Sequence, residues 1–175
     1  ALQAYGQHRE RMVNEKLTLA QAVGEENRKA PAQSSPATIA LIGHPYLLYD
    51  EYVNHRLIHR LEQAGSRVVT SEMLSPGELE SATARLVGKA YWTYEEEIVG
   101  AGGHYLQDKV DGIIGVMAFG CGPDSLMVEM VRRQAVRLKS IPFMSLTLEE
   151  HTAEAGIVTR LEAFTDMIQR RKRGQ

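Results

Sequence analysis

Residues 110–125, VDGIIGVMAFGCGPDS, determine the architecture expected for this chain. The part from 110 to 119 is an apolar run typical of a buried strand, and a helical pattern of apolar residues continues from 126 to 138. A strand that breaks at glycines and restarts as a helix places its turn, here 120–125, at the carboxyl end of a sheet. Ligands bind at that end in open α/β proteins, so we expect the functional site there.

Three further runs of β-branched and apolar residues predict strands, and helical patterns separate them. The four expected strands are 38–42, 67–70, 110–119 and 141–146. Strands that alternate with helices are parallel and are joined by right-handed crossovers. We therefore predict an α/β, Rossmann- or flavodoxin-like domain of three layers, with a four-stranded parallel sheet in the order 2-1-3-4.

Local signals mark where several helices begin. Ser75-Pro76-Gly77-Glu78 combines a capping box with proline at the first helical position, and Thr93-Tyr94-Glu95-Glu96 predicts a second box. Asp50 is expected to cap a helix that ends at Gly65. The aromatic pair Tyr91-Trp92 is expected to anchor the core.

The chain divides into two parts by composition. Residues 1–37 are predicted to hold an N-terminal helix, from about Leu2 to Arg28, and a linker rich in proline and serine at 29–36. Residues 38–175 form the predicted α/β domain. Because the sequence begins at Ala1 rather than Met, we expect this domain to be a fragment of a larger protein.

Charge and cysteine content favour a cytoplasmic protein. The 20 Lys and Arg residues nearly balance the 22 Asp and Glu residues, which gives no electrostatic case for a nucleic-acid or membrane partner. No apolar run approaches the ~20 residues that span a bilayer, and we expect no signal peptide. A single cysteine excludes an internal disulfide and suits a reducing cytosol.

The predicted strand order brings three loops to one rim. A crevice opens between the turns 43–46 and 120–125, and the loop 149–154 lies beside it. The candidate ligand-binding residues on this rim are His44, Tyr46, Gly120, Gly122, Asp124, Ser125, Glu150 and His151. Cys121, the only cysteine, is the candidate metal-ligating residue.

Each candidate also has a structural explanation, and these alternatives stay open. His44 can simply bond to backbone, Glu150 and His151 can form a surface pair, and Cys121 can be buried and inert. Asp124 or Ser125 is expected to be the N-cap of the helix that follows. A catalytic thiol with a histidine base is another alternative, but no oxyanion site can be named from the sequence. A zinc site is a further one, but two histidines and one cysteine show no recognised ligand spacing. His55 and His59 are expected to face solvent.

Four segments together resemble a known family. They are 42–46 with Asp50 and Asn54, 91–97, 111–125 and 150–164. Over about residues 38–168 the chain resembles the 2-hydroxyacyl-CoA dehydratase D-component family, in the branch associated with CoA-substrate-specific enzyme activases.

The resemblance implies an iron–sulfur site. The related 2-hydroxyglutaryl-CoA dehydratase subunits hold a cluster through cysteine thiolates and receive electrons from an ATP-hydrolysing activase. Carried over, Cys121 is a ligand of a [4Fe–4S] cluster. A cluster usually takes about four protein ligands, mostly cysteines, so the others must come from outside this chain. The implied partners are other domains of the same polypeptide, an activase or a second copy in a homodimer, and the isolated chain is expected to be inactive.

Two other functions remain open beside this one. The amides at the start of the helix after Cys121 can bind a phosphate, which makes a non-catalytic module for CoA, a CoA ester or another phosphate-bearing ligand the main alternative. A structural scaffold with an inactive site is the third.

Overall fold

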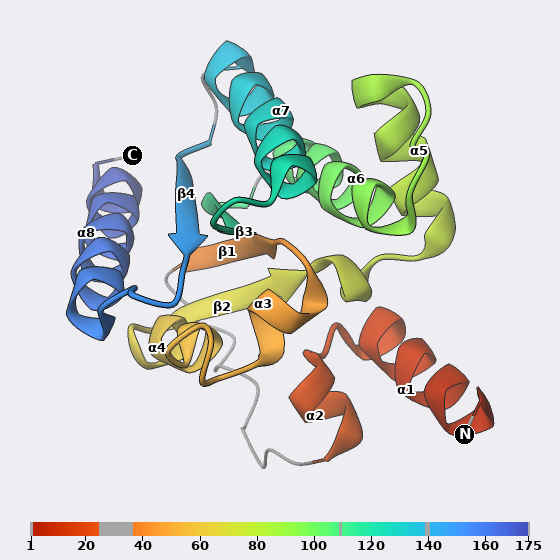
Figure 1. The fold of residues 1–175 in the computed structure, drawn as a ribbon, viewed down its shortest axis with the longest axis horizontal. Coiled ribbons are helices and arrows are strands. Elements are labelled where there is room, and N and C mark those ends of the chain that lie inside the picture. The colour runs from red at the N-terminus through yellow and green to blue at the C-terminus, as the bar shows by residue number, and fades with distance from the viewer. Residues whose placement is uncertain (1, 25–36, 109, 139–140, 175) are drawn as a thin grey trace.

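The computed structural model describes residues 2–24, 37–108, 110–138 and 141–174. Strands alternate with helices from β1 onward, as the sequence pattern predicts (Figure 1). The strands are β1 (Ala37–Ile42), β2 (Ser66–Thr70), β3 (Gly112–Ala118) and β4 (Phe143–Leu148). The helices are α1 (Leu2–Glu15), α2 (Leu19–Val23), α3 (Pro45–Tyr49), α4 (Leu57–Gln63), α5 (Pro76–Val87), α6 (Thr93–Gln107), α7 (Gly122–Leu138) and α8 (Glu154–Arg173), with a 3₁₀ turn, η1 (Ser71–Met73).

The four strands form one parallel sheet in the order β2-β1-β3-β4, which confirms the predicted topology. The ladder between β3 and β4 runs from Ile113 opposite Phe143 to Ala118 opposite Leu148. Strand β4 therefore begins and ends two residues later than predicted. Pro142 lies before it because proline has no amide hydrogen to donate, although its carbonyl accepts a bond from Ile113 N (3.0 Å).

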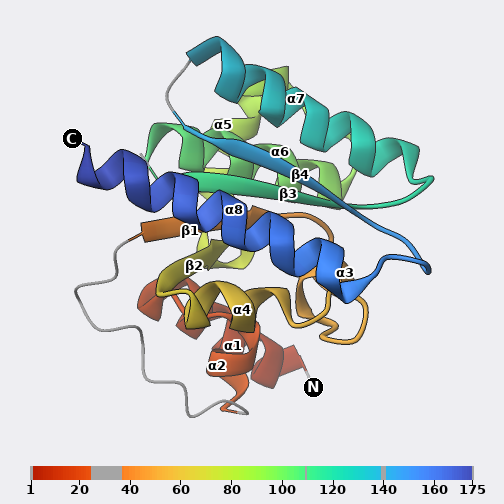
Figure 2. The same ribbon diagram turned by 90° about the vertical axis from the view of Figure 1, so that its left-hand side faces the viewer.

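Helices cover both faces of the sheet, as Figure 2 shows. Alternate residues of each strand point to opposite faces, so β1 sends Ala40 and Ile42 into one core and Ile39 and Leu41 into the other. The first core is closed by apolar residues of α5, α6 and α7, and the second by those of α3, α4 and α8. The central strands β1 and β3 are mostly buried on both faces, which explains why they are the most apolar runs of the sheet.

The N-terminal segment forms two helices, so the single helix predicted from about Leu2 to Arg28 is wrong. Lys16 adopts a left-handed backbone (φ 54°) after α1, and Thr18 starts α2 in a capping box with Gln21. Lys16 Nζ donates to the Met73 carbonyl (2.7 Å), which ties the end of α1 to η1. The predicted linker, 29–36, lies outside the described residues, and the domain boundary at 37 stays a prediction.

Helix starts were predicted with mixed success. The capping box of α5 is confirmed, since Glu78 N donates to Ser75 Oγ (3.3 Å) and Ser75 N donates to Glu78 Oε2 (2.7 Å). The box at Thr93 is wrong, because α6 begins at Thr93 itself without a side-chain cap. Asp50 caps no long helix. It ends α3, and its carboxylate instead accepts the amides of Tyr52 (3.0 Å) and Val53 (3.1 Å).

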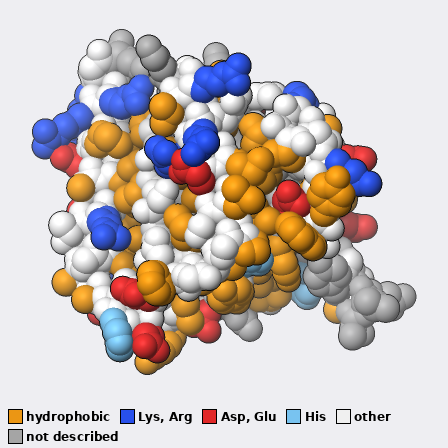
Figure 3. All heavy atoms as spheres, turned by 45° about the horizontal axis from the view of Figure 1, so that its top comes forward, with side chains coloured by type: hydrophobic (Ala, Val, Ile, Leu, Met, Phe, Trp, Pro, Cys, Tyr) orange, Lys and Arg blue, Asp and Glu red, His pale blue; other side chains and the backbone are white. Residues whose placement is uncertain are grey.

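The surface carries charges of both signs close together. In Figure 3, Lys and Arg side chains are spread over the face shown, with Asp or Glu beside several of them. Tyr91 and Trp92 are 78% and 64% exposed, so the prediction that they anchor the core is wrong. Among the described helices, none is both long and apolar enough to cross a lipid bilayer.

Candidate functional site

The candidate site lies where β1 and β3 end side by side. The chain leaves β1 toward β2 on one side and leaves β3 toward β4 on the other, so this is the topological switch point of the sheet. Gly43 makes the turn after β1 fit closely against β3. A Cβ atom there would lie 2.6 Å from the Val116 carbonyl oxygen, so only glycine leaves the backbones this close. His44 follows immediately and starts α3.

A buried carboxylate lies against the His44 imidazole. His44 Nδ1 and Asp124 Oδ1 are 2.6 Å apart, although the two atoms are not aligned as an in-line hydrogen bond. The Asp124 side chain is fully buried, and that of His44 is 17% exposed. The other carboxylate oxygen, Oδ2, accepts from Ala118 N at 3.4 Å. Asp124 thus connects the end of β3 to the turn after β1.

Two tyrosines flank the His44 ring. Tyr94, in the first turn of α6, meets it edge to face with ring centroids 4.6 Å apart, and Tyr46 stacks on it at 5.7 Å. Partial burial, and then electrostatic interactions with Asp124 and Cys121, raise the pKa of Tyr46. The Tyr46 hydroxyl is therefore neutral at physiological pH, and it lies within the electrostatic reach of both acidic groups.

Cys121 occupies the N-cap position of α7. It is a free, half-buried thiol whose carbonyl accepts from the amide (3.2 Å) and the hydroxyl (2.8 Å) of Ser125. The prediction that Asp124 or Ser125 is the N-cap is therefore wrong. The helix starts earlier because Gly120 takes a left-handed backbone (φ 77°) and turns the chain before it. Asp124 then lies one turn into the helix, on the face that it shares with Cys121.

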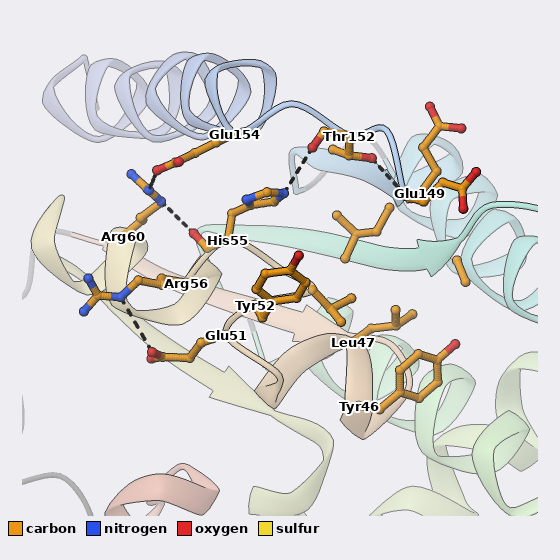
Figure 4. A pocket seen from close by; sticks show the side chains of 14 residues that line it. Tyr46, Leu47, Glu51, Tyr52, His55, Arg56, Arg60, Glu149, Thr152 and Glu154 are labelled. Carbon is orange, nitrogen blue, oxygen red and sulfur yellow. Dashed lines mark hydrogen bonds and ion pairs between the residues drawn. The ribbon is translucent and has the colours of Figure 1, made fainter.

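A cavity of about 600 Å³ opens beside this group (Figure 4). Its walls come from the α3–α4 connection, the end of β3 and the loop after β4, and Tyr46 borders both the cavity and the His44 pair. The charged residues that line it are Glu51, Arg56, Arg60, Glu149, Glu150 and Glu154. Both arginines are engaged, Arg56 with Glu51 (3.6 Å) and Arg60 with Glu154. The cavity wall is therefore more negative than positive.

The α3–α4 connection is held in an unusual conformation by a buried amide. Asn54 Nδ2 donates to the carbonyls of Leu47 (3.1 Å) and Leu48 (2.7 Å), and its Oδ1 accepts from Leu57 N (3.1 Å). The two residues between, His55 and Arg56, both adopt left-handed backbones (φ 52° and 61°). Strain of this kind persists only where the surroundings impose it, and it is common at functional sites.

Not all the residues predicted for the site come together. His44, Tyr46, Cys121 and Asp124 form one group, with Ser125 bound to the Cys121 carbonyl. Gly120 and Gly122 lie exposed in the same turn, and Glu150 lines the cavity. His151 lies 3.3 Å from Glu150, and both side chains are 84% exposed, which is a surface pair.

Sequence reasoning missed four residues of this region: Tyr94, His55, Arg56 and Arg60. Tyr94 stood beside Tyr91 and Trp92 in a segment expected to serve the core. His55 was expected to face solvent, but it is half-buried and its Nε2 contacts the Thr152 carbonyl (3.1 Å). The turn depends on hydrogen bonds between the Asn54 side chain and the backbone of Leu47, Leu48 and Leu57, and the sequence does not reveal these bonds.

The donor set does not fit a complete metal centre. Within the described ranges, no group of three or more His, Cys, Asp or Glu side chains is arranged to hold a metal ion. A [4Fe–4S] cluster usually takes about four ligands, mostly cysteines. The chain has one cysteine, so its own residues cannot hold such a cluster alone.

A second acidic group lies between η1, α3 and α6. Glu72 is buried, and its Oε2 accepts the hydroxyls of Tyr49 (3.0 Å) and Ser71 (3.2 Å). Neither Glu72 Oε1 nor Glu97 Oε2 has a hydrogen-bond partner among the described residues, although both atoms are buried. Burial, and then the charge of Glu72, raise the pKa of Glu97, while Arg9 of α1 opposes the shift.

Replacing Glu97 with glutamine is expected to stabilise the protein at neutral pH. Because the folded-state pKa of Glu97 is raised, the folded chain binds more protons than the unfolded chain, and stability falls as pH rises from the ordinary glutamate pKa through the raised one. E97Q removes this loss. The gain should be less than about 1 kcal/mol, because the side chain is partly solvated.

Urea unfolding of wild type and E97Q at several pH values checks this. The difference in the free energy of unfolding between E97Q and wild type should shrink as pH falls below the ordinary glutamate pKa. E80Q, at an exposed position of α5, is the matched control and should leave stability unchanged. A gain in E97Q that is the same at every pH would show that the effect is not the charge of Glu97.

A family model matches the N-terminal part of the chain. Residues 1–74, from α1 to the end of η1, match the family model of the CoA enzyme activase uncharacterised domain. No curated protein and no solved structure matches the chain. The match indicates a CoA enzyme activase-related domain and includes His44 and Tyr46. It does not reach Cys121 or Asp124, and it does not support the D-component dehydratase in particular.

Proposed function

We propose that this chain is a domain of an activase-related protein that contributes Cys121 to an iron–sulfur or redox site, completed by ligands from outside the chain. One observation carries the proposal: the only thiol lies half-buried at the switch point of the sheet, one helical turn before a fully buried aspartate that lies 2.6 Å from a histidine ring nitrogen. The match over residues 1–74 supports the activase relation, and the resemblance of segments 111–125 and 150–164 to D-components supports the role of the thiol.

An iron–sulfur site with one thiol from this chain needs ligands from another domain or protein. The surroundings of Cys121 favour such an interaction. Phe119, two residues before it, is 72% exposed, and Leu126 in the first turns of α7 is 60% exposed. Large apolar side chains that remain exposed beside a site commonly mark an interaction surface. Another domain of the same polypeptide, an ATP-dependent activase or a second copy would supply the missing ligands. A reducing cytosol is the compartment that would keep the thiol free.

The proposal predicts that iron depends on Cys121. The protein, purified without oxygen from expressing cells together with any partner it retains, should contain iron and acid-labile sulfide, and C121S should lose both. M167S, which replaces an exposed sulfur-containing side chain on α8, is the control and should keep them. Iron retained by C121S, or absent from the wild-type protein with its partner, would contradict the cluster.

The phosphate-binding alternative has less support in the geometry. The buried carboxylate of Asp124 already places a negative charge in the first turn of α7, where the amides would otherwise attract a phosphate. The cavity wall carries four glutamates against two paired arginines. A rise in melting temperature with CoA or a CoA ester, in a protein that holds no iron, would favour this alternative.

A further inference from the structure

The cavity between the α3–α4 connection and the loop after β4 has walls that are tied to each other. His55 Nε2 donates to the Thr152 carbonyl (3.1 Å), and Arg60 pairs with Glu154. The loop also closes on itself, because Glu149 N donates to Thr152 Oγ1 (2.8 Å) and Thr152 N to the Glu149 carbonyl (3.0 Å). The cavity is therefore pre-formed, and its volume of about 600 Å³ falls within the range of small-molecule sites.

Apolar and aromatic side chains make up much of the lining. Leu47 of α3, Ala118 of β3 and Leu148 of β4 line the cavity where these elements end. Tyr46 and Tyr52 lie on the side opposite the loop after β4 (Figure 4), and they are 55% and 92% exposed. The lining therefore offers both an apolar surface and the π faces of two tyrosines to a ligand.

The charges of the lining favour a cation. Each of its two arginines is already paired with a glutamate. Glu149 and Glu150 remain, and among the described residues neither forms an ion pair with a lysine or an arginine. The exposed His151 lies beside Glu150 (3.3 Å). Two carboxylates are thus left for a positive charge, whereas both arginines of the lining are engaged.

The chemistry of the lining suits an organic cation better than a metal ion. Within the described ranges, no group of three or more His, Cys, Asp or Glu side chains is arranged to hold a metal. An ammonium group needs no such coordination shell. It is attracted by the face of a tyrosine ring and by nearby carboxylates, and the carbon atoms attached to it pack on apolar side chains.

We propose that this cavity binds a small organic cation, a protonated amine on a short carbon chain. The ammonium group lies between the tyrosines, Tyr46 and Tyr52, and the carboxylates of Glu149 and Glu150, and the carbon chain lies on the apolar lining. Cys121 does not line the cavity, so the inference goes beyond the proposed function and does not depend on a cluster.

Three probes of the same length and different charge test the proposal. Pentylammonium, 1-pentanol and pentanoate are titrated separately into the ¹⁵N-labelled protein at neutral pH. Pentylammonium should shift the amide signals of Ala118, Leu148 and Thr152 along a saturable curve. Pentanol should bind at least about fivefold more weakly, because it lacks the charge that interacts with the rings and carboxylates, and pentanoate more weakly still.

Variants at exposed positions separate the charge from the fold. E149Q/E150Q should weaken pentylammonium binding about threefold or more and leave pentanol binding unchanged. Y52A should weaken it about two- to fivefold. The matched control is E80Q/E162Q, which removes the same two charges at exposed positions of α5 and α8 and should bind pentylammonium as wild type does.

Three results would overturn the inference. They are no saturable binding of pentylammonium, equal binding of pentanol or pentanoate, and unchanged pentylammonium binding in E149Q/E150Q. A loss of the same size in E80Q/E162Q would also overturn it, because net charge rather than the cavity would then attract the probe. None of these measurements involves Cys121 or iron, so the inference and the proposed function can fail independently.

Discussion

Leu41→Ala is expected to lower the free energy of unfolding by about 2–5 kcal/mol, the range measured for buried leucines in protein cores. Leu41 is fully buried in β1, between its sheet neighbours Thr70 of β2 and Ile114 of β3. Its side chain belongs to the core closed by α4 and α8. The truncation removes apolar contacts and leaves a cavity that a sheet covered on both faces cannot close.

Urea unfolding followed by circular dichroism measures the loss. The matched control is Leu126→Ala, since Leu126 is 60% exposed on α7 and the same truncation there should change stability by less than about 0.5 kcal/mol. Equal losses at the two positions would mean that β1 does not form the centre of the core.

Gly43→Ala is expected to destabilise the protein by about 1–3 kcal/mol through overpacking. The new Cβ would lie 2.6 Å from the Val116 carbonyl oxygen and 3.3 Å from the Val116 Cβ. Backbone atoms cannot move aside as the end of a flexible side chain can. The turn after β1 must therefore shift away from β3, and His44 should shift with it, away from Asp124.

Two measurements check this second prediction. Urea unfolding gives the loss of stability, and amide spectra should show chemical-shift changes at Ala118 and Asp124, which lie across the crevice from the substitution. Gly156→Ala is the control. A Cβ at Gly156 meets no atom within 4 Å, so the change in this exposed part of α8 should be neutral or stabilising by up to about 1 kcal/mol. If G43A were as harmless as G156A, the close approach of β1 to β3 would be wrong.

The sheet was predictable from sequence because its determinants are local and redundant. Each strand is an apolar run bounded by turn residues, and a helical pattern separates consecutive strands. For parallel strands connected in this way, handedness leaves few possible orders. The predictions that were wrong concern residues whose side chains interact with a partner distant in the sequence, so that their local preference does not decide the structure. Asp124 is a typical N-cap residue, yet its carboxylate serves Ala118 and His44 instead.

The candidate site was predictable only in outline. The strand order brings the turns at His44 and Cys121 to one edge, and this follows from topology alone. The edge-to-face contact of Tyr94 with His44 depends on how α6 packs, which no local pattern encodes. The left-handed backbones of His55 and Arg56 depend on the three hydrogen bonds of the Asn54 side chain. A propensity scale assigns Asn54 to a turn but does not predict its partners.

The central place of β1 has a consequence for how the chain folds. β1 must pair with β2, which follows soon after it, and with β3, which is synthesised much later. The segment that matches the activase domain, residues 1–74, contains β1 and β2 but not β3. One edge of β1 thus remains unpaired until β3 arrives, and such long-range pairing slows folding. The matched segment therefore ends before the sheet is complete, and during synthesis the unpaired edge of β1 is a surface open to pairing with other chains.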